Sequence, residues 1–215
     1  MKKTLIAVPC MDQVPAQFCQ SLATLEKSGP TVVAFQVGSL VYSSRNNLAI
    51  QALKNEADYV LWLDSDMMFP SGVLRHMIQE LEKQEGDVIL SGVYYRRVAP
   101  FSPVAYEKLD IDDQGRATWK ELEQIPEDVF EVEGCGFGCV LMPTSALVDV
   151  QTKYGTMFNP INGTGEDLSF CWRARQCGWK FLCDPRMDLG HVGHHVITKE
   201  YYQDYLSYKQ EDNHE

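Results

Sequence analysis

The segment YVLWLDSDMMFP, residues 59–70, decides the fold that we predict for this chain. Its first five residues form a continuous apolar run, rich in aromatic and branched side chains, which is typical of a strand covered on both faces. The run ends abruptly at Asp64-Ser65-Asp66. Because ligands of open α/β sheets bind just beyond the carboxyl ends of the strands, we expect both carboxylates at the edge of a buried sheet.

Two carboxylates with one small residue between them indicate a metal site or a solvated turn. Unpaired, they would repel each other, and each is costly to remove from water. A hard divalent cation removes both penalties, since carboxylate oxygens suit magnesium, calcium and manganese. In the alternative, the turn is exposed to solvent and Ser71 caps the helix that follows.

The segments around this strand alternate between strand and helix patterns. The sequence predicts strands at 4–8, 31–37, 88–94, 139–142 and 180–183, and helices at 16–27, 44–55, 71–84, 144–150 and 166–176. In the first half, this alternation is typical of a parallel sheet with right-handed crossovers. The fold class that we predict is therefore α/β, with a mainly parallel central sheet flanked by helices.

The alternation stops between residues 95 and 133, where three prolines and a turn-like Asp-Asp-Gln-Gly replace helical spacing. This section predicts a small antiparallel excursion within a single domain that spans residues 1–215. Residues 196–215 carry four tyrosines at mixed helical spacing and predict a C-terminal helical tail.

Composition narrows the possible partners and the compartment. A net charge of −11 argues against a nucleic-acid groove, which needs a basic stripe, and a phosphate ligand would need a cation to bind here. Seven scattered cysteines suit a reducing compartment, and no apolar run approaches transmembrane length. We therefore expect a soluble cytoplasmic protein with no transmembrane segment.

Glu166-Asp167 opens a predicted helix after a glycine-rich loop, and two interpretations fit it. Thr164 and Asp167 have the spacing of a capping box, and acidic residues favour the first turn of a helix. Alternatively, a carboxylate here is a general base for a bound hydroxyl, with its pKa lowered by the helix dipole.

His191 follows the last predicted strand and lies close in sequence to His194 and His195. Imidazole together with carboxylate favours manganese, iron or zinc over calcium, so His191 is a candidate metal ligand. The alternative is a structural or surface histidine.

Three further features have both a functional and a structural interpretation. The glycine-rich loop at 134–138 either lets a ligand approach the backbone closely or forms a bulged turn. Arg45, at the start of a helix, and the pair Arg96-Arg97, after a strand, are either phosphate contacts or surface cations.

Together these elements resemble the nucleotide-diphospho-sugar glycosyltransferases of the GT-A fold, especially the small bacterial and phage inverting enzymes. The resemblance covers residues 4–191. The matching elements, in family order, are Ser44-Arg45-Asn46, the DxD motif Asp64-Ser65-Asp66, the glycines at 134–138, Gly165-Glu166-Asp167 with Phe170 and Arg173, and His191.

The resemblance implies a metal-dependent transfer of a sugar from a nucleotide-diphosphate donor to a glycan or other hydroxyl acceptor, with inversion. The metal is Mn²⁺ or Mg²⁺, with manganese preferred. Asp167 is the implied base, and Glu166 orients the acceptor. The implied donor-binding residues are Pro9, Arg45, Asp64, Ser65, Asp66 and Gly136, and the implied metal ligands are Asp66, His191 and Asp64.

Three other functions stay open at this point. A sugar nucleotidyltransferase usually has a glycine- and arginine-rich loop after its first strand, which residues 9–13 lack. A nucleotide-sugar or glycan-binding module without turnover, and a structural metal protein, are the remaining alternatives.

Overall fold

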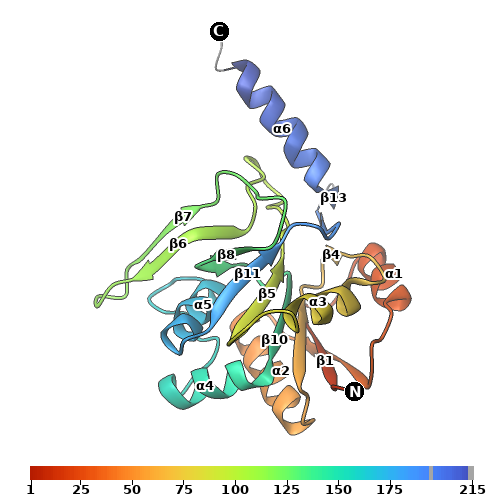
Figure 1. The fold of residues 1–215 in the computed structure, drawn as a ribbon, viewed down its shortest axis with the longest axis vertical. Coiled ribbons are helices and arrows are strands. Elements are labelled where there is room, and N and C mark those ends of the chain that lie inside the picture. Colours follow the sequence, from red (N-terminus) through yellow and green to blue (C-terminus); the bar gives the residue numbers. More distant parts are fainter. Residues whose placement is uncertain (194–195, 213–215) are drawn as a thin grey trace.

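The computed structural model describes residues 1–193 and 196–212, and Figure 1 shows its arrangement. The helices of the described part are α1 (Ala16–Thr24), α2 (Val41–Lys54), α3 (Val73–Leu81), α4 (Thr144–Tyr154), α5 (Glu166–Gln176) and α6 (Lys199–Asp212). Its strands are β1 (Thr4–Cys10), β2 (Thr31–Val37), β3 (Tyr59–Leu63), β4 (Met67–Met68), β5 (Val88–Gly92), β6 (Ala105–Ile111), β7 (Ala117–Glu121), β8 (Phe130–Val132), β9 (Gly134–Cys135), β10 (Cys139–Pro143), β11 (Lys180–Asp184), β12 (Gly190–Val192) and β13 (Val196–Ile197).

The main sheet has seven strands in the order β2-β1-β3-β10-β5-β11-β8. Strand β1 runs parallel to β2 and β3, and β11 runs parallel to β5. Strand β10 is antiparallel to both β3 and β5, and β8 is antiparallel to β11. The mainly parallel α/β sheet that we predicted is confirmed. The direction of β10 was not predicted, because an apolar run reports burial and does not report strand direction.

Two apolar clusters fill the two faces of this sheet. On one face, Leu5, Val60 and Trp62 pack against helices α2, α4 and α5. On the other face, Ile6 and Leu61 pack against α1 and α3 (Figure 1). Strand β3 is therefore buried on both sides, as its continuous apolar run predicted, and the chain leaves the sheet at Asp64.

The antiparallel excursion is built mainly from β6 and β7, which form a hairpin around a turn at Asp112. Strand β9 pairs with β6, so the three strands make a small separate sheet. Strand β8 lies within the predicted excursion by sequence, but it joins the main sheet through β11.

Two helix starts differ from the prediction. Helix α3 begins at Val73 without a side-chain cap, and the Ser71 hydroxyl instead donates to Glu26 Oε1 (3.3 Å), so the capping role given to Ser71 was wrong. Helix α2 begins at Val41, three residues early, because the Leu40 carbonyl accepts the N–H groups of Ser43 and Ser44.

Helix α6 begins against the body of the protein and then extends away from it (Figure 1). Tyr202 stacks on Tyr95 with ring centroids 4.8 Å apart, and Phe101 meets the rings of Tyr201 and Tyr205 edge to face. Within the described residues, no helix combines the length and the apolarity needed to cross a bilayer.

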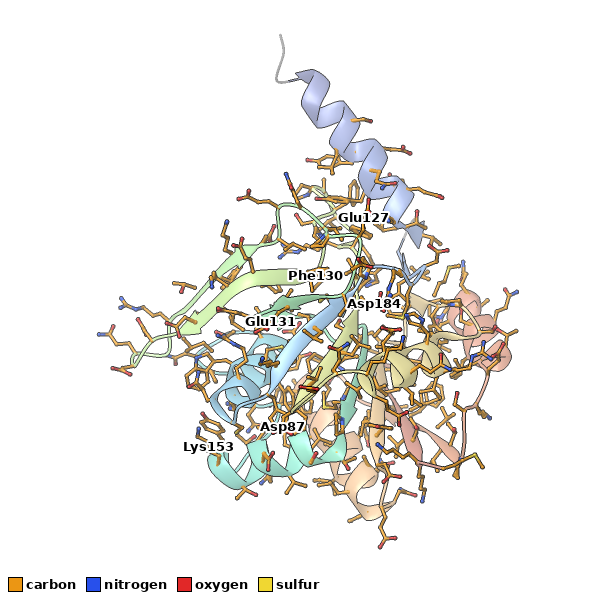
Figure 2. The ribbon with its side chains drawn as sticks, in the orientation of Figure 1. Asp87, Glu127, Phe130, Glu131, Lys153 and Asp184 are labelled. Atoms are coloured by element: carbon orange, nitrogen blue, oxygen red, sulfur yellow. The ribbon has the colours of Figure 1, made fainter. Side chains whose placement is uncertain are left out.

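Asp184, at the carboxyl end of β11, is fully buried and ties α3 to the sheet (Figure 2). Its carboxylate accepts hydrogen bonds from Arg186 Nε (2.8 Å) and Nη2 (2.7 Å) and lies 2.8 Å from His76 Nε2. Burial works to raise the pKa of Asp184, but Arg186 and His76 lower it to about 2. Folding therefore stabilises the ionised carboxylate.

We expect Asp184→Asn to lower the free energy of unfolding at pH 7 by about 2–3 kcal/mol, which corresponds to lowering a pKa from about 4 to about 2. A depressed pKa stabilises the fold above the unfolded value, so this difference should shrink as the pH falls from about 4 toward 2. Urea unfolding at pH 7 and pH 3 measures it. Asp87→Asn is the control, because Asp87 is exposed at the opposite end of the β5–β11 pair (Figure 2). Equal losses in both variants would contradict the role of Asp184.

Candidate active site

A cleft of about 350 Å³ lies at the carboxyl ends of β1, β2 and β3, where the fold class predicted a ligand site. The following fifteen residues line it: Pro9, Cys10, Met11, Gly38, Ser39, Val41, Ser44, Arg45, Asp64, Ser65, Asp66, Arg97, Glu166, Asp167 and His191. The structure thus brings together eight of the nine residues to which the sequence assigned a site role. The ninth, Gly136, lies elsewhere.

Arg45 of α2 holds two carboxylates at the base of this cleft. Its side chain is 2% exposed; Nη2 donates to Asp64 Oδ1 (2.8 Å) and Nε donates to Glu166 Oε1 (3.1 Å). The guanidinium also lies over the rings of Trp62 and Phe137, at 5.7 and 5.2 Å. Burial raises the pKa of Asp64, and the nearby Asp66 adds to that effect, whereas Arg45 opposes it. A fixed cation therefore connects the end of β3 to the start of α5.

The pairing of β4 with β12 brings His191 beside Asp66. In this register His191 lies opposite Met67, and the Val192 N–H donates to the Asp66 carbonyl (2.7 Å). His191 Nδ1 is 2.8 Å from the Tyr95 carbonyl oxygen, which can only accept a hydrogen bond, so Nδ1 carries a proton. A neutral His191 ring then presents the lone pair of Nε2, which lies 3.5 Å from Asp66 Oδ1.

The Arg97 guanidinium approaches the Asp66 carboxylate on the side away from His191. Arg97, in the loop after β5, places Nη1 2.9 Å from Asp66 Oδ2. Burial works to raise the pKa of Asp66, but a protonated His191 ring and the Arg97 guanidinium outweigh it and leave this pKa below its ordinary value. Asp66 is therefore held as a carboxylate.

The donor atoms of Asp66 and His191 fit a divalent cation. Two ligands about 2.1 Å from one ion, at about 90–110° to each other, are about 3.0–3.5 Å apart, and the two facing atoms are 3.5 Å apart. The Nδ1 hydrogen bond to a backbone carbonyl is the arrangement that fixes a ligating histidine. These two side chains can therefore supply two ligands to one metal ion.

The predicted set of three metal ligands is not assembled. Within the described residues, no group of three or more His, Cys, Asp or Glu side chains is arranged to hold a metal ion. Asp64 does not join Asp66 and His191, because Arg45 holds its carboxylate. Magnesium-type sites commonly use one or two carboxylates together with water and substrate phosphates, so two protein ligands remain compatible with a cation. His194 and His195 lie outside the described residues.

Asp167 lies in the first turn of α5 and faces the same cleft. The predicted capping box does not form, because Gly165 is the N-cap and Asp167 Oδ1 accepts from the adjacent Leu168 N–H (2.7 Å). Burial, and after it the charge of Glu166, raise the pKa of Asp167 to about 6. The expectation of a lowered pKa was wrong, since burial and the neighbouring carboxylate raise it by more than the Leu168 N–H and Arg45 lower it. A carboxylate with this pKa is poised to exchange a proton near neutral pH.

The loop before α5 is anchored by side chains of α2 and α5. Asn46 Oδ1 accepts from the Phe158 N–H (3.0 Å), and Asn46 Nδ2 donates to Asn159 Oδ1 (2.8 Å). From α5, Arg173 Nη1 donates to the carbonyls of Met157 (3.1 Å) and Asn159 (2.7 Å). These contacts fix the start of α5 relative to α2, and they account structurally for the Asn46 and Arg173 of the sequence resemblance.

Gly136 does not line the cleft, and its predicted contact with the donor is not supported by its position. A Cβ at Gly136 would lie 2.1 Å from the Tyr94 hydroxyl oxygen, and one at Gly138 would lie 2.7 Å from the same ring. The Gly138 N–H donates to that hydroxyl (3.2 Å), and the Tyr94 ring meets the His191 ring edge to face. The close approach inferred from these glycines is therefore made by a buried tyrosine that supports His191.

Arg97 is the cleft residue that the sequence left undecided. Its neighbour Arg96 turns away and pairs with Glu121 Oε1 (2.7 Å) and the Tyr106 hydroxyl (3.1 Å). The one sequence signal for Arg97 is a cation directly after a buried strand in an acidic chain. That signal cannot distinguish it from Arg96.

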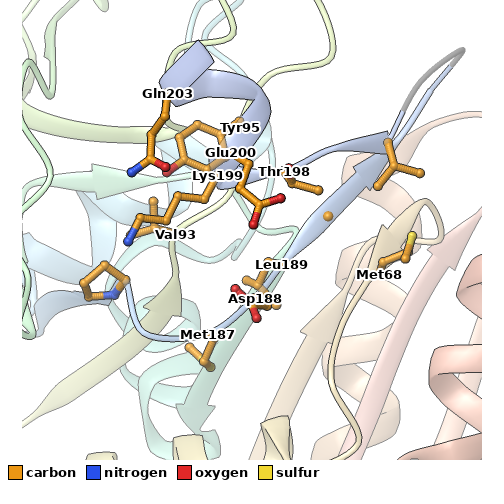
Figure 3. Close-up of a pocket in the computed structure, with 13 residues that line it drawn as sticks. Met68, Val93, Tyr95, Met187, Asp188, Leu189, Thr198, Lys199, Glu200 and Gln203 are labelled. Carbon is orange, nitrogen blue, oxygen red and sulfur yellow. The ribbon is translucent and has the colours of Figure 1, made fainter. Parts of the chain in front are cut away.

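A second cavity, of about 510 Å³, lies behind β12 and under the start of α6 (Figure 3). Gly190 borders this cavity, whereas the next residue, His191, lines the cleft. The walls of the second cavity combine apolar side chains such as Met187 and Leu189 with Lys199 and Glu200 of α6 (Figure 3). The carboxylates, imidazole and guanidinium groups that contact one another gather in the smaller cleft, so we place the candidate active site there.

Comparisons with known proteins agree with this architecture. The family model Anp1 matches residues 38–146, slightly more than half of the chain. A197 from STIV is similar in structure, with a TM-score of 0.65 and 17% sequence identity over 92% of this chain and 94% of that chain. GalNAc-T7, solved with UDP, GalNAc and Mn²⁺, has a TM-score of 0.60 and 10% identity over 90% of this chain and 44% of that chain. A search of curated proteins gave no match. These similarities show a GT-A fold and confirm the one that the sequence resemblance predicted.

Proposed function

This chain belongs to Anp1, a GT-A-like mannosyltransferase family, and from that premise we propose its function. We propose that the protein transfers a sugar from a nucleotide-diphosphate donor to an acceptor hydroxyl. The observation that carries this proposal is the meeting of Asp66 and His191 in the cleft that also contains Asp167. Asp66 and His191 suit a cation that binds a diphosphate. Asp167 is a carboxylate poised to take a proton.

The donor side of the proposal rests on the carboxyl ends of the first three strands. Pro9 lies near the carboxyl end of β1 and Ser65 follows β3, and both line the cleft beside Arg45 and Asp64. Because Arg45 already neutralises Asp64, a diphosphate approaching this wall meets less negative charge than the acidic sequence suggests. The structure of GalNAc-T7, which was solved with UDP and Mn²⁺, supports testing a nucleoside diphosphate together with manganese first.

Asp66 and His191 are the residues that would hold a divalent cation, with Mn²⁺ preferred to Mg²⁺ because one ligand is an imidazole. When bound, such a cation acts as a Lewis acid that neutralises the charge developing on the leaving diphosphate. Tyr95 and Tyr94 keep the His191 ring in position from two sides. The metal role that we assigned to Asp64 is not proposed again, since its carboxylate is bound to Arg45.

The acceptor side rests on α5. With a pKa of about 6, Asp167 is largely ionised above that pH and can take the proton of an acceptor hydroxyl as it attacks. Glu166, held by Arg45, borders the same space and would orient the acceptor. A direct attack assisted by one base inverts the configuration at the sugar carbon, so we propose an inverting reaction.

We expect the wild-type protein to be stabilised by UDP or GDP in the presence of Mn²⁺, and we expect Asp66→Ala to abolish this metal-dependent shift. A ligand at one hundred times its Kd stabilises a folded protein by about 2.7 kcal/mol, which thermal unfolding detects. Asp110→Ala is the matched control. Asp110 is exposed on β6, and Asp110-Ile111-Asp112 repeats the acid-x-acid spacing of Asp64-Ser65-Asp66. Undiminished, metal-dependent nucleotide binding in Asp66→Ala would remove Asp66 from the site.

Release of nucleoside diphosphate from a sugar donor then distinguishes an enzyme from a binding module. A module binds the donor and leaves it intact, whereas the proposed enzyme releases the diphosphate in the presence of a hydroxyl acceptor. Metal-dependent binding of the donor without any release would favour the module.

A further inference from the structure

The contact between Arg97 and Asp66 occupies the carboxylate to which we assign the metal. Asp66 Oδ2 is 2.9 Å from Arg97 Nη1, and Asp66 Oδ1 faces His191 Nε2. A cation bound between Asp66 and His191 would therefore face the positive guanidinium at close range. Like charges at that separation repel, so the ion pair and the metal compete for one carboxylate.

The two arginines that line the cleft differ in their freedom to move. Arg45 is buried and bonded to Asp64 and Glu166, so it cannot move away without leaving both carboxylates unpaired. Arg97 has a side chain that is 49% exposed and lies in the loop between β5 and β6. Among the described residues, its other hydrogen bond is a long one to the Val192 carbonyl (3.5 Å). Arg97 can therefore turn away from Asp66 at small cost.

If Arg97 leaves Asp66, its guanidinium can bind a diphosphate in the same cleft. The cleft contains four carboxylates, and a diphosphate placed beside them needs more positive charge than one divalent ion supplies. Guanidinium binds phosphate oxygens through two parallel hydrogen bonds, a geometry that lysine cannot reproduce.

We propose that Arg97 exchanges partners: it pairs with Asp66 when the cleft is free of metal and binds the diphosphate once a cation has taken Asp66. This inference rests on the proposed function. The exchange makes metal and nucleotide binding cooperative, because a cation bound to Asp66 would leave the Arg97 guanidinium free to bind the diphosphate. The coupling is reciprocal, so each ligand raises the affinity of the other by the same factor.

Titration calorimetry tests the exchange with Mn²⁺ alone and with UDP and GDP at saturating Mn²⁺. Removing the ion pair in Arg97→Gln should raise the affinity for Mn²⁺ alone by about two- to fivefold, the range expected for a partly exposed pair. The same substitution should lower the affinity for the diphosphate by about ten- to a hundredfold, the range expected for a hydrogen bond to a charged group. Two changes of opposite sign are the signature of the exchange. Arg97→Lys should keep the low affinity for free metal and lose part of the affinity for the diphosphate.

Arg96→Gln is the matched control, because it removes the same charge from the neighbouring residue. The Arg96 side chain is bonded to Glu121 and Tyr106 and does not contact Asp66 in the described structure. Both of its affinities should equal those of the wild type. Unchanged affinities in Arg97→Gln, or two changes in the same direction, would overturn the exchange and leave the proposed function intact. A wild-type protein that binds neither Mn²⁺ nor either diphosphate would overturn both.

Discussion

Asp167→Asn is expected to lower turnover by about a hundred- to ten-thousand-fold, the usual contribution of a positioned general base. Asparagine has nearly the same shape but cannot take a proton. Donor binding should change little, because Asp66, His191 and Arg45 lie on the donor side and do not depend on Asp167 for a hydrogen bond. Initial rates of diphosphate release measure turnover, and calorimetry with UDP or GDP and Mn²⁺ measures binding.

The pH profile gives a second measurement of the same role. Since the Asp167 pKa is raised to about 6, the base is protonated below that pH and ionised above it. The wild-type kcat/KM should therefore rise as the pH increases through about 6 and then level off, and this rise should be missing from the residual activity of Asp167→Asn.

Asp188→Asn controls for the loss of a carboxylate, because Asp188 is exposed and lines the second cavity behind β12. It should keep both the wild-type rate and the wild-type pH profile. A normal rate in Asp167→Asn would exclude Asp167 as the base.

The elements that the sequence predicted best are those whose pattern has one physical cause. The run at 59–63 is apolar at every position because β3 is covered on both faces, and the predicted bounds agree with the structure. Helix α5 was also predicted with its bounds, since a glycine precedes it and a glycine follows it. The direction of β10 and the transfer of β8 to the main sheet depend on which strands become neighbours. Periodicity within one segment contains no information about that choice.

The sequence predicted which residues form most of the candidate site, but it did not predict which of them contact one another. Asp66 and His191 are far apart in the sequence, and only the register of β4 against β12 brings them to 3.5 Å. The pKa of Asp167 depends on burial by the completed fold, so a prediction from the helix dipole alone gave the wrong direction. Gly136 was assigned to a ligand because a glycine reports close approach by some group, and the sequence cannot tell a ligand from the Tyr94 ring.

Arg45→Met is expected to destabilise the protein by about 3–5 kcal/mol at pH 7, the usual cost of removing one partner from a buried ion pair. Methionine fills much of the space over Trp62 and Phe137, so the loss comes mainly from Asp64 and Glu166, which keep their burial without a cation. Without Arg45, the pKa of Asp64, already raised by burial, should rise further. Urea unfolding of the variant and the wild type measures the loss.

The sign of the pH dependence separates this explanation from a packing defect. A carboxylate whose folded pKa lies above its unfolded value stabilises the fold while protonated, and this contribution is lost as the pH rises through the folded pKa. The penalty of Arg45→Met should therefore be smaller at pH 4 than at pH 7, whereas a cavity would cost the same at both. The double variant Arg45→Met with Asp64→Asn removes one charge of each sign and should recover part of the stability at pH 7. If the penalty is independent of pH and the second substitution only adds to it, Arg45 acts through packing, and the electrostatic connection between β3 and α5 is not what holds Glu166 and Asp167 at the cleft.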